Sequence, residues 1–260
     1  MTSSKPTEDP LKNWADWNLT FSQKPELVST LSSGLTNQSY LIEADNQKYV
    51  LRINAYNSEA LGIDREREKI IIEKASSAGI APTTLYCSVE DQVLITEYIE
   101  GQNWQTVDLQ DKQKKILLID KLEQIHSLQV DTSSLNYYVH AEKYWQSLVE
   151  SNNSIPETLN RHRELILNEM KDHSASNIIC HHDPNPNNII IRSNQLFFID
   201  WEYAAPGWPA LDYAALSVEW AVSVSQLNLP EQIEVDDVLQ AIEFYKYLCE
   251  LWAAIQNDKA

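Results

Sequence analysis

The stretch 181–220 constrains this chain more than any other part of its sequence. It holds two groups of acidic and amide residues separated by a short apolar run. Asp183 lies in a proline-rich loop with Asn188 five residues later, and Asp200 directly follows the apolar residues 196–199. Strands that end in carboxylates and amides can gather these groups around a divalent cation and a phosphate. The alternative, a polar turn between two strands, explains single residues but not the combined spacing.

The composition indicates a globular protein with an acidic surface. The chain has 260 residues, 43% of them hydrophobic, which is enough for one large or two smaller folded units. The formal net charge of -18 opposes binding to nucleic acid or to an anionic membrane. The N-terminus has no apolar leader and no run is long enough to span a membrane. We therefore expect a cytoplasmic protein without membrane insertion, either a monomer or a homodimer.

The cysteines and histidines do not show the spacing of a metal site. The three cysteines are far apart and lie in apolar contexts, so we expect reduced core thiols: Cys87, Cys180 and Cys249. His126 lies on an amphipathic segment and is expected to be a packing residue. Three further histidines are interpreted as surface residues: His140, His162 and His173.

The N-terminal part reads as a strand-rich region that could bind phosphates. Residues 39–42 and 48–53 predict two strands, and the small residues of 32–37 precede them. Backbone N–H groups of such a turn can bind a nucleotide phosphate. The alternative is a plain surface turn, because this segment contains a single glycine. The candidate nucleotide contacts in it are Ser33, Gly34, Thr36 and Asn37.

A strand arginine and a helix glutamate suggest an ion pair. Arg52 alternates with apolar residues on the second predicted strand. A helix is predicted from Asp64 to Gly79, since it has an acidic start and a glycine stop. Glu68 on this helix is placed to reach Arg52. A cation held in this way can bind the nonreacting phosphates of a nucleotide.

The pattern changes from strand-rich to helical after Gly101. We therefore place a boundary there, with residues 1–100 forming a small antiparallel sheet with one helix and residues 101–260 a mostly helical unit. Residues 1–20 are interpreted as a tail and a short helix. Further helices are predicted over 109–128, around 144–148, from 156 onward and over 238–252.

Phosphoryl transfer is the chemistry that these residues support. It requires a carboxylate near the attacking hydroxyl, an amide and a carboxylate on magnesium, and a cation on the nonreacting phosphates. The first three are supplied by Asp183, Asn188 and Asp200. Arg52, backed by Glu68, supplies the fourth. The cofactors predicted on this basis are ATP and Mg²⁺.

The motifs HHDPNPNN and FIDWEY resemble those of the aminoglycoside phosphotransferase and choline kinase superfamily, which are relatives of protein kinases. Within it, the chain is more similar to choline/ethanolamine kinases, on the strength of the run 199–203, then Asp212, then Glu219 with Trp220. The similarity extends from about residue 30 to the C-terminus and is thinnest over 108–177. It implies an α+β fold of the two-lobed, protein-kinase-like type.

The resemblance also implies roles for single residues. Asp183 would be the catalytic base or would orient the acceptor hydroxyl, and Asn188 and Asp200 would bind magnesium. The segment containing Glu97 and Ile99 would offer backbone groups to adenine. The acceptor, a small amino alcohol with choline first and ethanolamine second, would lie among Asn185, Glu202, Tyr203, Glu219, Trp220 and Trp252. For the three aromatic residues, plain core packing is the alternative.

Some positions depart from the choline kinase pattern. Cys249 stands where these kinases usually have a tryptophan, and Val224 stands where an aromatic residue is often found. Trp201 replaces the usual Phe, as in thiamine-kinase-like relatives. Thiamine kinase and aminoglycoside phosphotransferase activities therefore stay open as alternatives. A nucleotide-binding pseudokinase with a scaffold role is the alternative that is not an enzyme.

Overall fold

The computed structural model describes residues 9–33, 36–56, 58–150, 155–171 and 176–257. The chain divides into two compact units. The first comprises residues 1–57 and 82–99, and the second comprises residues 58–81 and 100–260. The chain thus leaves the first unit for one helical segment, returns to it for two strands, and leaves it again after Ile99.

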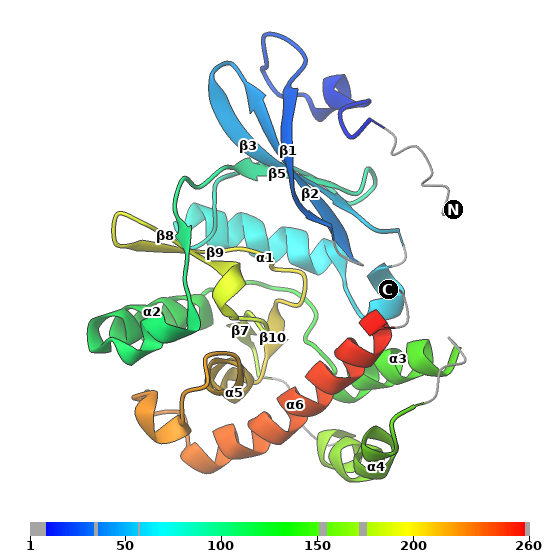
Figure 1. The fold of residues 1–260 in the computed structure, drawn as a ribbon, viewed down its shortest axis with the longest axis vertical. Coiled ribbons are helices and arrows are strands. Elements are labelled where there is room, and N and C mark those ends of the chain that lie inside the picture. Colours follow the sequence, from blue (N-terminus) through cyan, green and yellow to red (C-terminus); the bar gives the residue numbers. More distant parts are fainter. Residues whose placement is uncertain (1–8, 34–35, 57, 151–154, 172–175, 258–260) are drawn as a thin grey trace. The chain divides into compact units, whose positions relative to one another are not determined.

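The first unit is built on a five-stranded antiparallel sheet of order β1-β2-β3-β5-β4 (Figure 1). A two-residue turn joins β2 to β3, and both of its residues, Asp45 and Asn46, have the positive φ that a tight hairpin turn requires. One face of the sheet buries Ile42, Leu51 and Ile95. The strands are β1 Glu26–Ser33, β2 Asn37–Ala44, β3 Gln47–Asn54, β4 Thr84–Ser88 and β5 Val93–Glu97.

The described part of the N-terminal segment contains a short helix, as the sequence predicted within residues 1–20. It is the 3-10 helix η1, Trp14–Trp17, and Asn18 ends it in the left-handed conformation. Leu11 and Trp17 bury their side chains in the core of the sheet, so this segment packs against the first unit.

The second unit is mainly helical. Its long C-terminal helix α6 packs against α3, α4 and α5 (Figure 1). Its α-helices are α1 Arg65–Ser77, α2 Lys112–His126, α3 Tyr137–Glu150, α4 Glu157–Lys171, α5 Pro209–Glu219 and α6 Val235–Asn257. Its short 3-10 helices are η2 Ser58–Leu61, η3 Thr106–Gln110, η4 Pro186–Asn188 and η5 Val224–Gln226.

Two small antiparallel sheets carry the loops of interest in the second unit. One has the order β6-β8-β9 and the other pairs β10 with β7. The strands are β6 Gln102–Asn103, β7 Ile178–Cys180, β8 Ile189–Arg192, β9 Gln195–Phe198 and β10 Ala205–Gly207. The hairpin of β8 and β9 was predicted from the apolar run before Asp200 and is confirmed.

Helix α1 belongs to the second unit, whereas the sequence interpretation had grouped it with the sheet. Its ends are as predicted, since Asp64 accepts a hydrogen bond from the Arg67 N–H at 3.0 Å and Gly79 has a φ of 68°. Its side chains bind within the second unit, however, because the Arg67 Nε donates to the Ala204 carbonyl at 3.1 Å. In the described part of the chain, no helix is both long and apolar enough to cross a membrane.

Candidate active site

The loop of residues 181–188, which joins β7 to β8, is the centre of the site. Asn185 caps the short helix η4, since its Oδ1 accepts a hydrogen bond from the Asn187 N–H at 2.9 Å. Pro186 follows at the first helical position, where its missing N–H costs no hydrogen bond. The local sequence therefore fixes the turn that carries Asp183.

Two amides hold the Asp183 carboxylate. Asn185 Nδ2 donates to Oδ1 and Asn188 Nδ2 donates to Oδ2, each at 2.8 Å. Burial raises the pKa of Asp183 to about 7; the hydrogen bond from Asn185 opposes this rise, and the negative charge of Glu219 adds to it. The side chain is half-buried, so a ligand can still reach it. A carboxyl group with this pKa can exchange a proton near neutral pH.

The carboxylate of Asp212, on α5, holds the backbone of the same loop through hydrogen bonds. We call this arrangement the Asp212 brace. Its Oδ2 accepts the backbone N–H of His181 at 3.0 Å, and its Oδ1 accepts that of His182 at 2.7 Å. The Nε2 of His126 lies 2.9 Å from Oδ2 and must donate to it. Burial alone would raise the pKa of Asp212, but the hydrogen bond from His126 holds it below its usual value. Asp212 is fully buried within the second unit.

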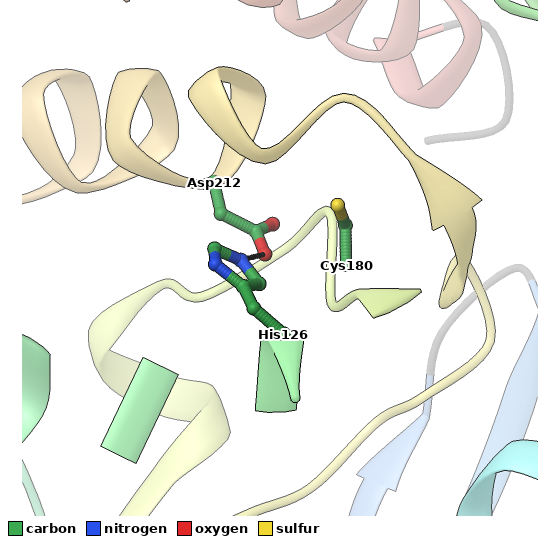
Figure 2. A group of neighbouring side chains, drawn as sticks. All are labelled: His126, Cys180 and Asp212. Atoms are coloured by element: carbon green, nitrogen blue, oxygen red, sulfur yellow. Dashed lines mark hydrogen bonds and ion pairs between the residues drawn. The ribbon is translucent and has the colours of Figure 1, made fainter. Parts of the chain in front are cut away.

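Figure 2 shows Asp212 of α5 with neighbouring side chains from two other elements, His126 at the end of α2 and Cys180 at the end of β7, and the hydrogen bond drawn joins His126 to Asp212. Their ligand-type atoms lie within 4.8 Å of one another. The Asp212 oxygens already accept three N–H donors, which accounts for the cluster as a hydrogen-bonded support. His126 is thus a hydrogen-bond partner of Asp212, and the prediction that it is not a metal ligand stays a prediction.

Asp200 lies next to this loop. It follows β9 and has a φ of 62°, so the chain turns sharply at it. The preceding residue, Ile199, donates its N–H to the Asn188 carbonyl at 2.9 Å and accepts a hydrogen bond at its own carbonyl from His181 Nε2 at 3.1 Å. These two bonds bring the predicted metal ligands, Asn188 and Asp200, to neighbouring backbone positions. An amide oxygen and a carboxylate are the hard ligands that Mg²⁺ prefers, so the residues fit that ion.

A cavity of about 120 Å³ opens beside Asp183. We call it the aromatic cavity, because four large rings line it: Tyr144, Tyr203, Tyr245 and Trp252. The Tyr144 hydroxyl donates to the Tyr203 hydroxyl at 3.0 Å. Its lining contains no lysine or arginine among the described residues, and Asp183 supplies a carboxylate. The remaining lining residues are Leu135, His140, His182, Leu211, Leu248 and Cys249.

Of the residues predicted to contact the acceptor, some line the aromatic cavity or bind one of its lining residues, and two others lie elsewhere. Tyr203 and Trp252 line the aromatic cavity. Glu219 contacts a lining residue, since its carboxylate accepts a hydrogen bond from the Tyr245 hydroxyl at 3.1 Å. Asn185 binds Asp183, as described above.

Glu202 and Trp220 are not among the lining residues. Glu202 is buried and pairs with Arg65 at 3.3 Å. Trp220 is buried in contact with the Trp104 ring, and its indole N–H donates to the Pro184 carbonyl at 3.0 Å. This tryptophan therefore supports the 181–188 loop, which is the packing role that the sequence left open.

Several lining residues were not identified from the sequence. His140 was interpreted as a surface residue, which is wrong, because it is 5% exposed and its ring packs on Tyr144 with 4.6 Å between the ring centroids. Burial lowers its pKa to about 3, so it is neutral. Tyr245 and Tyr144 each lie within a helix that the sequence predicted, but neither was singled out as a candidate site residue. All three cysteines are free thiols, as predicted, but only Cys180 is buried in the core. Cys87 is partly exposed, and Cys249 lines the aromatic cavity.

Several predicted nucleotide contacts of the first unit lie at or beside strand ends. Ser33 ends β1, and Thr36 and Asn37, both buried, stand before and at the start of β2. Arg52 is buried on β3. Gly34 lies outside the described residues.

The segment after β5 is tied into the sheet through its backbone. Glu97 donates its N–H to the Thr83 carbonyl at 2.9 Å, and Tyr98 donates to that of Lys48 at 3.1 Å. Ile99, the other predicted adenine contact, follows directly and is buried.

Glu68 of α1 has a partner within the second unit. Its carboxylate accepts a hydrogen bond from the Arg65 guanidinium at 2.7 Å, and both side chains are buried. The pairing of Glu68 with Arg52 stays a prediction.

Comparisons with known proteins agree on one family. A family model described as choline/ethanolamine kinase matches residues 28–258. The protein LicA of Haemophilus influenzae is 27% identical over 192 residues, which cover 72% of this chain and 56% of that protein. A LicA homolog of Mycoplasma capricolum is 28% identical over 239 residues, covering 88% of this chain and 90% of that protein.

Solved structures share the fold. The crystal structure of choline kinase LicA from Streptococcus pneumoniae has a TM-score of 0.73 and 22% identity, covering 90% of this chain and 88% of that one. An aminoglycoside-3'-phosphotransferase of type VIII has a TM-score of 0.61 and 17% identity, covering 87% of this chain and 93% of that one. The predicted α+β, protein-kinase-like fold is thereby confirmed.

Proposed function

The chain belongs to the choline/ethanolamine kinase family, and we propose that it transfers the γ-phosphoryl group of ATP to the hydroxyl of a small amino alcohol, choline first and ethanolamine second. The observation that carries this proposal is the aromatic cavity beside Asp183. A quaternary ammonium ion is attracted to the faces of aromatic rings and to carboxylates, and it needs no basic partner. The lining offers the first two features and contains no lysine or arginine among the described residues.

The reaction would proceed at Asp183. The acceptor hydroxyl loses its proton to the Asp183 carboxylate while its oxygen forms a bond to the γ-phosphorus, and the bond from that phosphorus to the ADP oxygen breaks. The hydrogen bonds from Asn185 and Asn188 orient the carboxylate without a positive charge. They therefore leave it basic enough to take the proton.

The cofactor sites follow from the same assignment. Asn188 and Asp200 would hold Mg²⁺, which when bound neutralises charge on the phosphates. Nucleotide contacts are assigned to the first unit and to α1: Ser33, Gly34, Thr36, Asn37, Arg52, Glu68, Glu97 and Ile99. A related choline kinase structure, that of LicA, was solved in complex with AMP, which supports nucleotide use within the family.

The lining of the cavity favours an acceptor with a single ammonium group. Four aromatic rings and one carboxylate suit such a group better than a polycationic aminoglycoside, while thiamine, which is also a cationic alcohol, stays the nearest alternative. The sequence fills all three proposed catalytic positions, with Asp183, Asn188 and Asp200, which argues against a pseudokinase role. We further propose that the enzyme works in the cytoplasm, as a monomer or a homodimer.

A panel assay tests the proposal. ADP release is measured with ATP, Mg²⁺ and, separately, choline, ethanolamine, thiamine and an aminoglycoside, and we expect the highest kcat/KM with choline. Asp183→Asn is expected to lower kcat by about 10³-fold or more while the affinity for nucleotide is kept. No ADP release with any alcohol would overturn the proposal, and an Asp183→Asn variant as active as the wild type would overturn the role of Asp183.

A further inference from the structure

One wall of the aromatic cavity is a stripe of helix α6. Tyr245, Cys249 and Trp252 all line the cavity, and their spacing of four and then three residues puts them on one face of the helix. Two of the three side chains are large aromatic groups, and the one between them is small. The wall therefore gives the ligand most room at Cys249.

The carboxylate of Glu219 lies next to Cys249. The Sγ of Cys249 is 3.9 Å from Oε1 of Glu219, and the same oxygen accepts a hydrogen bond from the Tyr245 hydroxyl at 3.1 Å. Burial raises the pKa of the Cys249 thiol to about 12, with a further contribution from the charge of Glu219, so the thiol is neutral. A cationic group that extends toward Cys249 would thus approach the Glu219 carboxylate beside the smallest of the three α6 side chains that line the cavity.

We infer that Cys249 sets the upper size limit of the acceptor's ammonium group, and that its short side chain admits N-ethyl and small cyclic ammonium alcohols in addition to N-methyl ones. The inference rests on the proposed function, because it takes the aromatic cavity as the acceptor site. Each further CH₂ group of the ligand that packs against Cys249 would be removed from water. It would lie between the aromatic side chains of Tyr245 and Trp252. A bulkier residue at this position would occupy that volume and exclude the larger head groups.

The first test measures kcat/KM for ethanolamine, choline, N,N-diethyl-N-methylethanolammonium and N-(2-hydroxyethyl)-N-methylpyrrolidinium. For the wild type, we expect the two larger alcohols to fall within about tenfold of choline. Cys249→Phe is expected to lower kcat/KM for them by a further tenfold or so, through KM, with ethanolamine little changed. Cys249→Ser, which keeps the size, is the matched control and should retain the wild-type order.

A second measurement needs no turnover. Calorimetry gives the affinities of tetramethylammonium and tetraethylammonium for the wild type and for both Cys249 variants, and Cys249→Phe is expected to reduce only the affinity for the larger ion. Wild-type discrimination of about 100-fold against the larger ions and alcohols would overturn the inference. An equal loss for all ligands in Cys249→Phe would also overturn it, since that result indicates a structural role. If no alcohol is phosphorylated, the proposed function fails, and the calorimetric comparison still decides the role of Cys249.

Discussion

The raised pKa of Asp183 predicts that this carboxylate destabilises the folded protein at neutral and alkaline pH. Burial raises its pKa from 3.8 to about 7, a rise of about 3 units, and each unit corresponds to about 1.4 kcal/mol. An acid with a raised folded-state pKa holds its proton more tightly when folded. Stability is therefore lost as the pH rises from about 4 to about 7, and the loss is complete above that range.

The perturbation is Asp183→Asn, which removes the titration. At about pH 5.5 the wild-type carboxylate costs roughly 2 kcal/mol, and at about pH 8.5 it costs roughly 4 kcal/mol. Both figures are upper limits, because the side chain is half-buried. The variant also loses one amide contact, at a cost of about 1 kcal/mol that does not depend on pH. The stability difference between variant and wild type is therefore expected to grow in the variant's favour by about 2 kcal/mol between the two pH values.

Urea unfolding at both pH values, without nucleotide and with a chelator, measures this difference. Both conditions lie above the sequence pI of about 4.6, where the protein keeps a net negative charge. Asp131→Asn at an exposed site is the matched control. If the Asp183→Asn difference changes with pH no more than the control does, the burial argument for Asp183 is refuted.

Three further predictions follow from the site and its support. Calorimetry with tetramethylammonium is expected to show weaker binding below about pH 7, because protonation of Asp183 removes a negative charge from the aromatic cavity; a pH-independent affinity would contradict this. Trp252→Ala is expected to raise KM for choline about tenfold with kcat nearly unchanged, whereas an equal fall in kcat would place Trp252 in the chemical step. Arg65→Ala is expected to lower the free energy of unfolding by about 3–5 kcal/mol, since it removes the buried guanidinium that pairs with Glu68 and Glu202. Denaturant titration checks this last value, and a loss below about 1 kcal/mol would mean that the buried network contributes little.

The exposed pair of Arg161 and Glu157 supplies the control for the arginine experiment. Its atoms lie 2.9 Å apart, but the side chains are 68% and 85% exposed. Arg161→Ala is therefore expected to change the stability by no more than about 1 kcal/mol.

The proximity of Asp183, Asn188 and Asp200 was easier to predict from the sequence than the lining of the aromatic cavity. Asp183, Asn188 and Asp200 each lie beside a short apolar strand, so local spacing alone brought them to neighbouring turns. Trp220 shows the limit of such reasoning, because an aromatic residue near a site has the same sequence signal whether it lines a cavity or supports a loop. The indole N–H of Trp220 donates to the Pro184 carbonyl, and this contact depends on tertiary packing.

The bounds of a helix were easier to predict than the residues that contact it in the folded chain. The acidic start and glycine stop of α1 are local signals, and they gave its bounds. Its grouping with the second unit depends on Arg67 binding the Ala204 carbonyl, more than 130 residues away, which no local pattern encodes. His140 was misplaced for the same reason, since the Tyr144 ring that buries it covers a face that helical spacing alone does not identify.

The Asp212 brace has a consequence for how such an enzyme can change over evolution. The backbone at His181 and His182 is anchored by a buried carboxylate from α5, whereas Tyr245, Cys249 and Trp252 come from α6. If the proposed roles hold, substitutions on α6 would alter the range of acceptors without moving Asp183, the carboxylate proposed to take the proton. A lineage could then acquire a new substrate through a few helix positions while the step of phosphoryl transfer is inherited intact.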